Sequence, residues 1–349
     1  MEYIKFGKTD LKVSRVGFGA LPIQRTRLSE AIRILLRGLE NGINFYDTAR
    51  AYTDSEKKLG IAFKGKRHKV VIATKVHCKT KQEIFNLLEE SLKNLKTDYV
   101  DILQLHNPEK IPDPSDSNSA CAGLIEAKKK GMTGFIGISA HRFGNAKKAI
   151  TSGLYDTVQY PLSVLSSKKE IELIRLAKKN NVGFIAMKPL CGGLLKNIEI
   201  AFAFLWQYNC VVPIWGIQRM KELKQIIKLA EKPPVLDKDV KKEIEKEKKA
   251  LRTIFCRGCG YCLPCPAEIP IPMAARMKFL LRRAPYKKFL EPAWQEKMLR
   301  IQNCKKCGFC ISKCPYNLNT PEILEKMLAD YIDFAESKGV KVTGEKNEK

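Results

Sequence analysis

Short apolar runs alternate with amphipathic helical patterns eight times between residues 16 and 231. In one unit, the apolar run 70–76 (VVIATKV) precedes the segment 81–95 (KQEIFNLLEESLKNL), whose apolar residues recur at helical spacing. Parallel strands need a crossover connection, usually a helix, so this alternation predicts a parallel sheet. Eight units in about 230 residues fit an α/β fold of the closed (β/α)8 TIM-barrel type better than an open doubly wound sheet. The expected strands are 16–22, 43–48, 70–76, 100–106, 135–141, 157–161, 183–189 and 211–217.

The sequence changes character after residue 232, where two prolines precede a charged helical pattern. Proline lacks the backbone N–H and disfavours helix in the residue before it, so the preceding helix must end there. From residue 256 onward, cysteine runs alternate with helical segments. The expected domains are a barrel over 1–232, a linker helix over 233–255, a small α-helical domain over 256–335 and a flexible tail over 336–349.

The composition is that of a folded chain. Of the 349 residues, 44% are hydrophobic and 29% are charged, which excludes intrinsic disorder because the chain can bury a core. No run of 18 uncharged apolar residues occurs, and the opening MEYIKFGKTD places charges where a signal peptide has its apolar segment. We therefore expect no membrane association and a cytoplasmic location. In that reducing compartment, cysteines act as metal ligands or catalytic groups rather than in disulfides.

The formal net charge of +26 is spread along the chain rather than gathered in a tail. No nucleic-acid recognition motif and no interleaving of aromatic and basic residues accompanies the charge, so we expect no nucleic-acid binding. The charge favours association with an acidic protein partner at a salt-dependent rate.

Two runs between residues 256 and 314 contain eight of the twelve cysteines. The first run separates its cysteines by two residues each time, the second by two, two and three, and a proline follows the last cysteine of each. In two-cluster ferredoxins, three cysteines so spaced bind one [4Fe–4S] cluster, while the fourth binds the other cluster. By that logic one cluster would be held by Cys256, Cys259, Cys262 and Cys314, and the other by Cys304, Cys307, Cys310 and Cys265.

Zinc is the alternative metal that four thiolates could bind, but zinc sites usually show two separated cysteine pairs. Gly258, Gly260 and Gly308 favour a backbone that bends tightly around a cluster. The 38 residues between the runs read as helical, so this region resembles the α-helical ferredoxin type. The presence of two clusters favours electron transfer, since a single cluster would be enough to stabilise the fold. A purely structural role for both clusters stays open.

Four polar side chains stand at the expected carboxyl ends of strands two, three and four, where barrels place their chemistry. They are Asp47 and Tyr52 (INFYDTARAY), Lys75 (VIATKVH) and His106 (ILQLHNP). As a set, they resemble the tetrad of the aldo-keto reductase family. The resemblance covers residues 1 to about 230 and includes the segments FGKTDLKVSRVGFGA, GISAH, VQYP and MKPLCGG.

The resemblance implies an oxidoreductase that reduces a small carbonyl substrate, or oxidises an alcohol, with NADPH or NADH. Tyr52 would donate a proton to the carbonyl oxygen. Lys75 would make this phenol more acidic, and Asp47 would hold the ammonium in place. His106 would orient the substrate oxygen through a hydrogen bond.

The resemblance also implies a nucleotide site at the later strand ends. Met187 would cover the nicotinamide ring, where many members have a tyrosine. Glu222 stands where NADP-preferring members carry an arginine, and its carboxylate would repel the 2′-phosphate of NADP. Arg219 could take the place of that arginine. NAD and NADP therefore both stay open as the cofactor. The implied nucleotide contacts are Ser139, His141, Gln159, Met187, Gly216, Ile217, Gln218, Arg219 and Glu222.

Nicotinamides pass electrons in pairs, whereas [4Fe–4S] clusters pass single electrons. Three functions stay open: electron transfer through a flavin or a redox partner such as ferredoxin, carbonyl reduction beside structural or redox-sensing clusters, and a non-catalytic barrel within an electron-transfer complex. We interpret Cys78 and Cys191 as small apolar residues rather than reactive thiols. Substrate choice would lie in loops such as 107–119.

Overall fold

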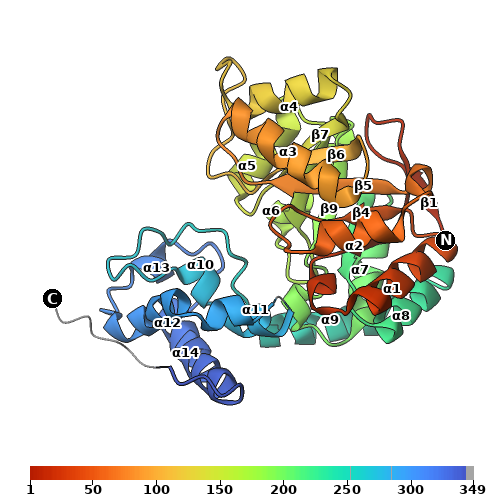
Figure 1. The fold of residues 1–349 in the computed structure, drawn as a ribbon. Coiled ribbons are helices and arrows are strands. Elements are labelled where there is room, and N and C mark those ends of the chain that lie inside the picture. Colours follow the sequence, from red (N-terminus) through yellow and green to blue (C-terminus); the bar gives the residue numbers. More distant parts are fainter. Residues whose placement is uncertain (252, 284, 343–349) are drawn as a thin grey trace. The chain divides into compact units, whose positions relative to one another are not determined.

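Eight parallel strands close into a barrel in the computed structural model, which describes residues 1–251, 253–283 and 285–342 (Figure 1). Each strand pairs with the next in chain order, and the last pairs with the first. The strands are β3 (Gly17–Gly19), β4 (Phe45–Asp47), β5 (Val71–Val76), β6 (Val100–His106), β7 (Thr133–Ser139), β8 (Thr157–Pro161), β9 (Gly183–Met187) and β10 (Val211–Gly216). The predicted (β/α)8 barrel is thus confirmed.

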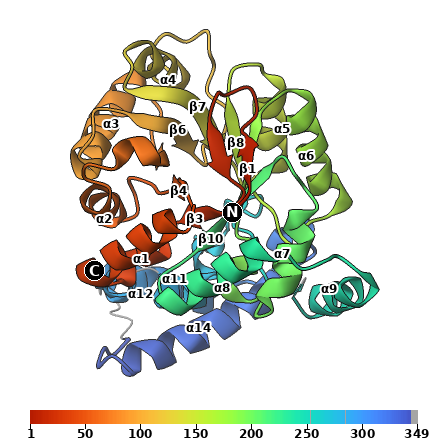
Figure 2. The same ribbon diagram turned by 90° about the vertical axis from the view of Figure 1, so that its right-hand side faces the viewer.

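A helix follows each barrel strand, and Figure 2 shows these helices arranged around the sheet. All six residues of β5 are buried, because helices cover the outer face while side chains fill the interior. The helices are α1 (Leu28–Glu40), α2 (Ser55–Ala62), α3 (Lys81–Leu95), α4 (Ala120–Lys129), α5 (Phe143–Thr151), α6 (Lys168–Lys179), α7 (Ile198–Trp206) and α8 (Met220–Glu231). Short 3-10 helices are η1 (Pro22–Arg25), η2 (Arg67–Lys69), η3 (Cys191–Gly193), η4 (Lys287–Leu290) and η5 (Arg300–Asn303).

An antiparallel hairpin of β1 (Tyr3–Lys5) and β2 (Lys12–Ser14) precedes the barrel, and the sequence analysis did not predict it. Its side chain Phe6 is fully buried in a cluster with Phe45 and other barrel residues. Gly7 has a φ of +61°, and a Cβ there would lie 2.4 Å from the backbone nitrogen of Gly183, at the start of β9. The hairpin therefore seals the barrel at the amino ends of its strands.

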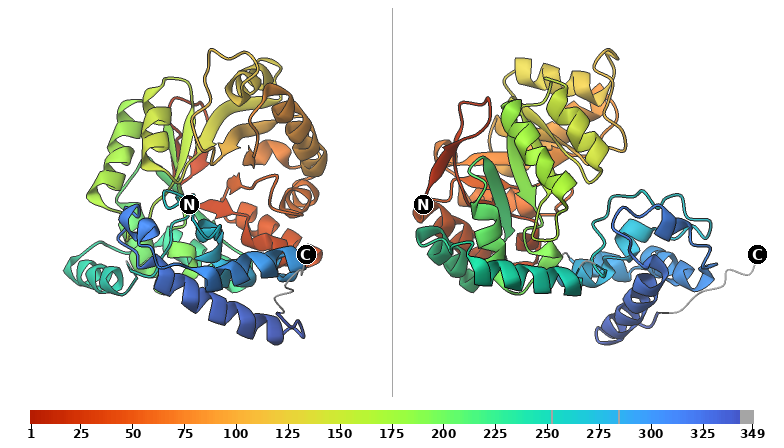
Figure 3. Two further views of the ribbon diagram at one scale, coloured as in Figure 1. Left: turned by 90° about the vertical axis from the view of Figure 1, so that its left-hand side faces the viewer. Right: turned by 180° about the vertical axis from the view of Figure 1, so that it is seen from behind.

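The chain divides into two units, one of Met1–Cys191 with Lys196–Glu243 and one of Gly192–Leu195 with Ile244–Lys349. The second unit is made of helices and loops (Figure 3). Its helices are α9 (Lys238–Leu251), whose first residues belong to the first unit, α10 (Ile271–Ala274), α11 (Met277–Arg283), α12 (Pro292–Leu299), α13 (Phe309–Ser312) and α14 (Thr320–Glu336).

The second unit has a hydrophobic core of its own. Met277, Leu281 and Met298 are fully buried in it, and the hydroxyl of Tyr331 donates to the carbonyl oxygen of Phe289 at 2.7 Å. Part of the tail expected over 336–349 lies outside the described residues, which end at 342. Within the described ranges, no helix combines the length and the apolar content that crossing a bilayer requires.

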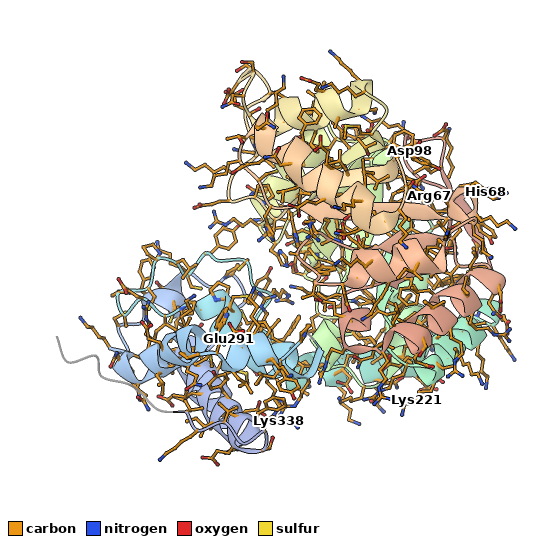
Figure 4. All side chains as sticks on the ribbon, viewed as in Figure 1. Arg67, His68, Asp98, Lys221, Glu291 and Lys338 are labelled. Atoms are coloured by element: carbon orange, nitrogen blue, oxygen red, sulfur yellow. The ribbon has the colours of Figure 1, made fainter. Side chains whose placement is uncertain are left out.

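The positive charge is carried by exposed side chains of both units. Lys221 on α8 and Lys338 after α14 are both exposed and point outward in Figure 4. Arg67, at the start of η2, is instead held by Asp101 at 2.6 Å and lies over the ring of Tyr99. Exposed lysines therefore occur on both units, which agrees with a charge spread along the whole sequence.

Candidate active site and cysteine cavities

The four candidate catalytic residues lie at the carboxyl ends of three adjacent strands. Asp47 ends β4 and pairs with Ala73, two residues before Lys75 on the same face of β5. Lys75 pairs in turn with Gln104, two residues before His106 on β6. Tyr52 comes from the loop between β4 and α2. The strand register therefore brings the predicted tetrad together at one end of the barrel.

Lys75 and Asp47 form a buried ion pair. The Lys75 ammonium donates to both carboxylate oxygens of Asp47, at 2.9 and 2.7 Å, and to the carbonyl oxygen of Thr48 at 2.5 Å. Burial raises the pKa of Asp47 and lowers the pKa of Lys75, and the opposite charge of each partner counters both shifts. Three acceptor oxygens thus saturate the ammonium.

Tyr52 lies directly beside this ion pair. The Lys75 ammonium is 5.2 Å from the centroid of the Tyr52 ring. Burial raises the pKa of Tyr52 well above its ordinary value, and the negative charge of Asp47 raises it further. The expected acidifying effect of Lys75 on this phenol stays a prediction, since the ammonium lies near the ring and is at the same time paired with Asp47. The phenol stays protonated at neutral pH.

His106 and His77 stack on each other with ring centroids 4.0 Å apart, and the edge of Tyr52 meets His106 at 5.9 Å. Burial, followed by the nearby His77 and Lys75, holds the pKa of His106 well below its ordinary value, so the imidazole is neutral. Its buried Nδ1 makes no hydrogen bond within the described part of the chain. His77 was not among the predicted site residues, although its spacing of two from Lys75 places both on one face of the strand.

Buried polar groups from β7 and β8 lie beside the tetrad. Gln159 is 1% exposed, and its Nε2 donates to Asp47 at 3.5 Å, while its Oε1 has no hydrogen-bond partner among the described residues. Ser139 is also 1% exposed and ends β7. Its Oγ accepts from the backbone of Asn107 at 3.1 Å, and the Asn107 side chain accepts from the backbone N–H of His141 at 3.0 Å. Asn107, missed from sequence, thereby fixes the two adjoining loops.

The remaining predicted nucleotide contacts include both buried and exposed residues. Met187 ends β9 and packs in the barrel interior, and Ile217 is fully buried. Gly216 ends β10, and Arg219 is exposed at the start of α8. The carboxylate of Glu222 accepts from the backbone N–H groups of Gln218 and Arg219, at 2.9 and 3.1 Å. Glu222 therefore caps α8 with one of its oxygens.

A cavity of about 740 Å³ adjoins the tetrad in the barrel unit. Its walls are Val76–Lys79, Glu83 and Leu105–Pro112, so they include His77, His106 and the first part of the loop 107–119. Cys78 lies in this wall, where burial and the nearby Glu83 raise its pKa to about 12. Its thiol is consequently protonated and weakly nucleophilic at neutral pH. Cys191 is fully buried.

The eight cysteines of the two runs surround two cavities in the second unit. One cavity is lined by Cys256, Cys259, Cys262 and Cys314, and the other by Cys262, Cys265, Cys304, Cys307 and Cys310. Each therefore combines cysteines from both runs. All eight thiols are free. Gly258, Gly260 and Gly308 have φ of 72°, 77° and 75°, so the loops bend where the sequence analysis expected. No three His, Cys, Asp or Glu side chains of the described ranges converge on a single-metal site.

Two families match the sequence. Residues 15–200 match the aldo/keto reductase family, and residues 255–319 match a 4Fe-4S dicluster domain. The first match covers the barrel strands up to β9 and all four tetrad residues, and the second covers both cysteine runs.

The curated relatives match a little over half of this chain, which in turn covers about two thirds of their length. An uncharacterized oxidoreductase, YqkF, of Bacillus subtilis is 30% identical over 205 residues, which are 55% of this chain and 65% of that protein. L-galactose dehydrogenase of Arabidopsis thaliana is 32% identical over 216 residues, 56% of this chain and 67% of that protein. The solved structure of aldo-keto reductase AKR11C1 from Bacillus halodurans, in its holo form, superimposes with a TM-score of 0.63 at 26% identity, covering 70% of this chain and 96% of that one.

Proposed function

Because the chain belongs to the aldo/keto reductase family, we propose that its barrel reduces the carbonyl group of a small substrate, or oxidises the corresponding alcohol, with NADH or NADPH. The observation that carries this proposal is the buried Lys75–Asp47 ion pair beside Tyr52 and His106. A buried charge pair is costly unless its geometry is good, and such arrangements gather at functional sites.

The reduction needs a hydride at the carbonyl carbon and a proton at the carbonyl oxygen, and a bound nicotinamide would supply the hydride. The fit of that group is supported by the buried Oε1 of Gln159, whose missing hydrogen bond a carboxamide N–H would provide. Ser139, at the end of the neighbouring strand β7, is a second buried polar group in reach of such a ligand.

Tyr52 is the proton donor in this proposal. Its raised pKa keeps the hydroxyl protonated at neutral pH, so it can give its proton to the oxygen as negative charge develops there. The neutral imidazole of His106 would donate a hydrogen bond to the same oxygen and orient it. The hydrogen bonds between Lys75 and Asp47 hold both side chains in place beside the phenol.

We further propose that the two cysteine cavities hold two [4Fe–4S] clusters. Each cavity is lined by at least four thiols, which are the ligands such clusters use. The clusters would supply one-electron transfer, and a flavin or a partner protein would link that transfer to the two-electron chemistry of the barrel. The use of eight cysteines as cluster ligands rather than in disulfides would fit a reducing, cytoplasmic location.

An acidic redox protein such as ferredoxin is the proposed partner. Between Cys304 and Cys314 the chain carries Lys305, Lys306 and Lys313 but no acidic residue. All three lysines are exposed, as is Cys307. Opposite charge at such a surface speeds association and orients the partner.

Anaerobic purification followed by separate titrations with NADH and NADPH tests the proposal. We expect brown protein, oxidation of one nucleotide in the presence of an aldehyde, and bleaching of the cluster absorbance by that nucleotide once a flavin or a ferredoxin is added. Aldehyde reduction without bleaching would leave the clusters a structural role. Full iron and sulfide without any nucleotide oxidation would overturn catalysis by the barrel.

A further inference from the structure

The guanidinium of Arg276 lies against the loop that carries the first cysteines. A Cβ on Gly258 would be 2.7 Å from the Arg276 Cζ and 3.0 Å from its Nε. Gly258 stands between Cys256 and Cys259, and its φ of 72° also favours glycine. A larger residue at position 258 would push the guanidinium away, so the loop is built for this close approach.

Arg276 is held in place from its other side. It lies between α10 and α11, its Nε donates to the carbonyl oxygen of Pro272 at 2.6 Å, and its terminal nitrogen lies 3.6 Å from the sulfur of Met273. Pro272 and Ala275, on the same segment, line the cavity of Cys256, Cys259, Cys262 and Cys314. Within the described residues, Arg276 forms no ion pair with a carboxylate.

The charge of Arg276 is therefore not cancelled by a neighbouring acid. Burial lowers its pKa and the thiolates of Cys256 and Cys259 raise it, but a guanidinium stays protonated in proteins. Arg257 lines the same cavity, is 7% exposed and lies 3.7 Å above the centroid of the Tyr316 ring. One guanidinium group, that of Arg257, therefore lines this cavity, and that of Arg276 lies against the Gly258 loop that carries two of its cysteines.

The second cavity has a different electrostatic environment. Its cationic wall residues, Lys305 and Lys306, are exposed, and Lys306 pairs with Glu325 at 3.2 Å. Water and salt screen exposed charges far more strongly than buried ones. A positive field of comparable strength therefore acts on only one of the two cavities.

We propose that Arg276 raises the reduction potential of the cluster held by Cys256, Cys259, Cys262 and Cys314, and leaves that of the other cluster unchanged. This inference rests on the proposed presence of both clusters. Reduction adds one electron and makes or breaks no bond, so the reduced cluster carries one more negative charge. A fixed cation nearby stabilises that added charge. Electrons that enter through the cluster at Cys307, whose side chain is exposed, would then pass to the cluster near Arg276 and stay there.

The test is a redox titration of the purified holoprotein followed by electron paramagnetic resonance, with Arg276→Gln compared with the unchanged chain. We expect one reduction step to lose at least tenfold in its equilibrium constant, about 59 mV for a one-electron couple, and the other step to stay within twofold. Arg276→Lys keeps the charge and should restore most of the difference. Lys306→Gln, the matched control on the other cavity, should move neither step beyond twofold.

A Cys307→Ser background assigns the steps, because it should remove the cluster of the other cavity. The step that remains must be the one that Arg276→Gln moves. Unchanged steps, or equal movement of both, would overturn the proposal. If Arg276→Gln loses iron, the titration is repeated with Arg276→Met, which keeps the side-chain stem. Loss of iron from both variants would assign Arg276 to cluster assembly and overturn its proposed effect on the reduction potential. Protein without iron and sulfide in its unmodified form would instead contradict the proposed function.

Discussion

The Lys75 ammonium donates to both carboxylate oxygens of Asp47 in the barrel interior, where the two side chains are 1% and 2% exposed. This two-point contact fixes the lysine beside Tyr52, 5.2 Å from the centroid of its ring. The phenol next to it is governed by burial, and it stays protonated. The site is therefore prepared to donate a proton rather than to accept one.

Tyr52→Phe should lower the rate of aldehyde reduction by about 10²–10⁴-fold, since it removes the only proposed acid while keeping the ring. The ring contacts with Lys75 and His106 need no hydroxyl, so folding should be unaffected. The rate is measured from nucleotide oxidation, with cluster absorbance as the internal control. Survival of the activity would show that another group supplies the proton.

The pH dependence should differ between the two directions of the reaction. A raised pKa keeps Tyr52 protonated throughout the neutral range, and a lowered pKa keeps His106 neutral there. Reduction should therefore change by less than about threefold between roughly pH 7 and pH 9, whereas alcohol oxidation, which needs the phenolate, should rise about tenfold per pH unit. A reduction rate that falls from pH 7 upward would show that Lys75 does acidify the phenol.

The fold was predictable because hydrophobic periodicity alone separates eight strands from eight helices. Every expected strand overlaps an observed one, although β3 is shorter than 16–22 because only Gly17–Gly19 pair with their neighbours. The hairpin of β1 and β2 was missed because strands of three residues carry too little pattern. The hairpin is positioned by the tertiary contact between Gly7 and the start of β9, which no local sequence pattern encodes.

Strand-end position and the family resemblance together pointed to the four tetrad residues, and the strand register brings them to one end of the barrel, whereas their electrostatics could not be predicted. The state of Tyr52 depends on where the Lys75 ammonium points, which is a matter of distances and not of residue types. Asn107 went unnoticed because its role is to join two loops that only the folded barrel brings together. Likewise, the approach of Arg276 to Gly258 links positions 18 residues apart through a helix packing that spacing does not show.

Removing the charge of Lys75 alone should destabilise the barrel strongly. Lys75→Met leaves Asp47 buried without its partner, which should cost about 3–5 kcal/mol, whereas the double change Asp47→Asn with Lys75→Met should cost less. Urea denaturation followed by circular dichroism compares the three proteins. A double variant less stable than Lys75→Met would contradict the view that an unpaired carboxylate is the main penalty.

Cys307→Ser should remove about half of the iron and labile sulfide, because a serine oxygen is a poor ligand for one of the two clusters. Stability should fall as well, since ligand binding by such small domains is coupled to their folding. The matched control is Cys78→Ser in the barrel unit, whose thiol is protonated because burial raises its pKa to about 12; its iron content should equal that of the unmodified chain. Iron and sulfide are determined on anaerobically purified protein. Full metal content in Cys307→Ser would mean that the exposed thiol is not a ligand, and the second cavity would then have to hold its cluster through Cys265, Cys304 and Cys310.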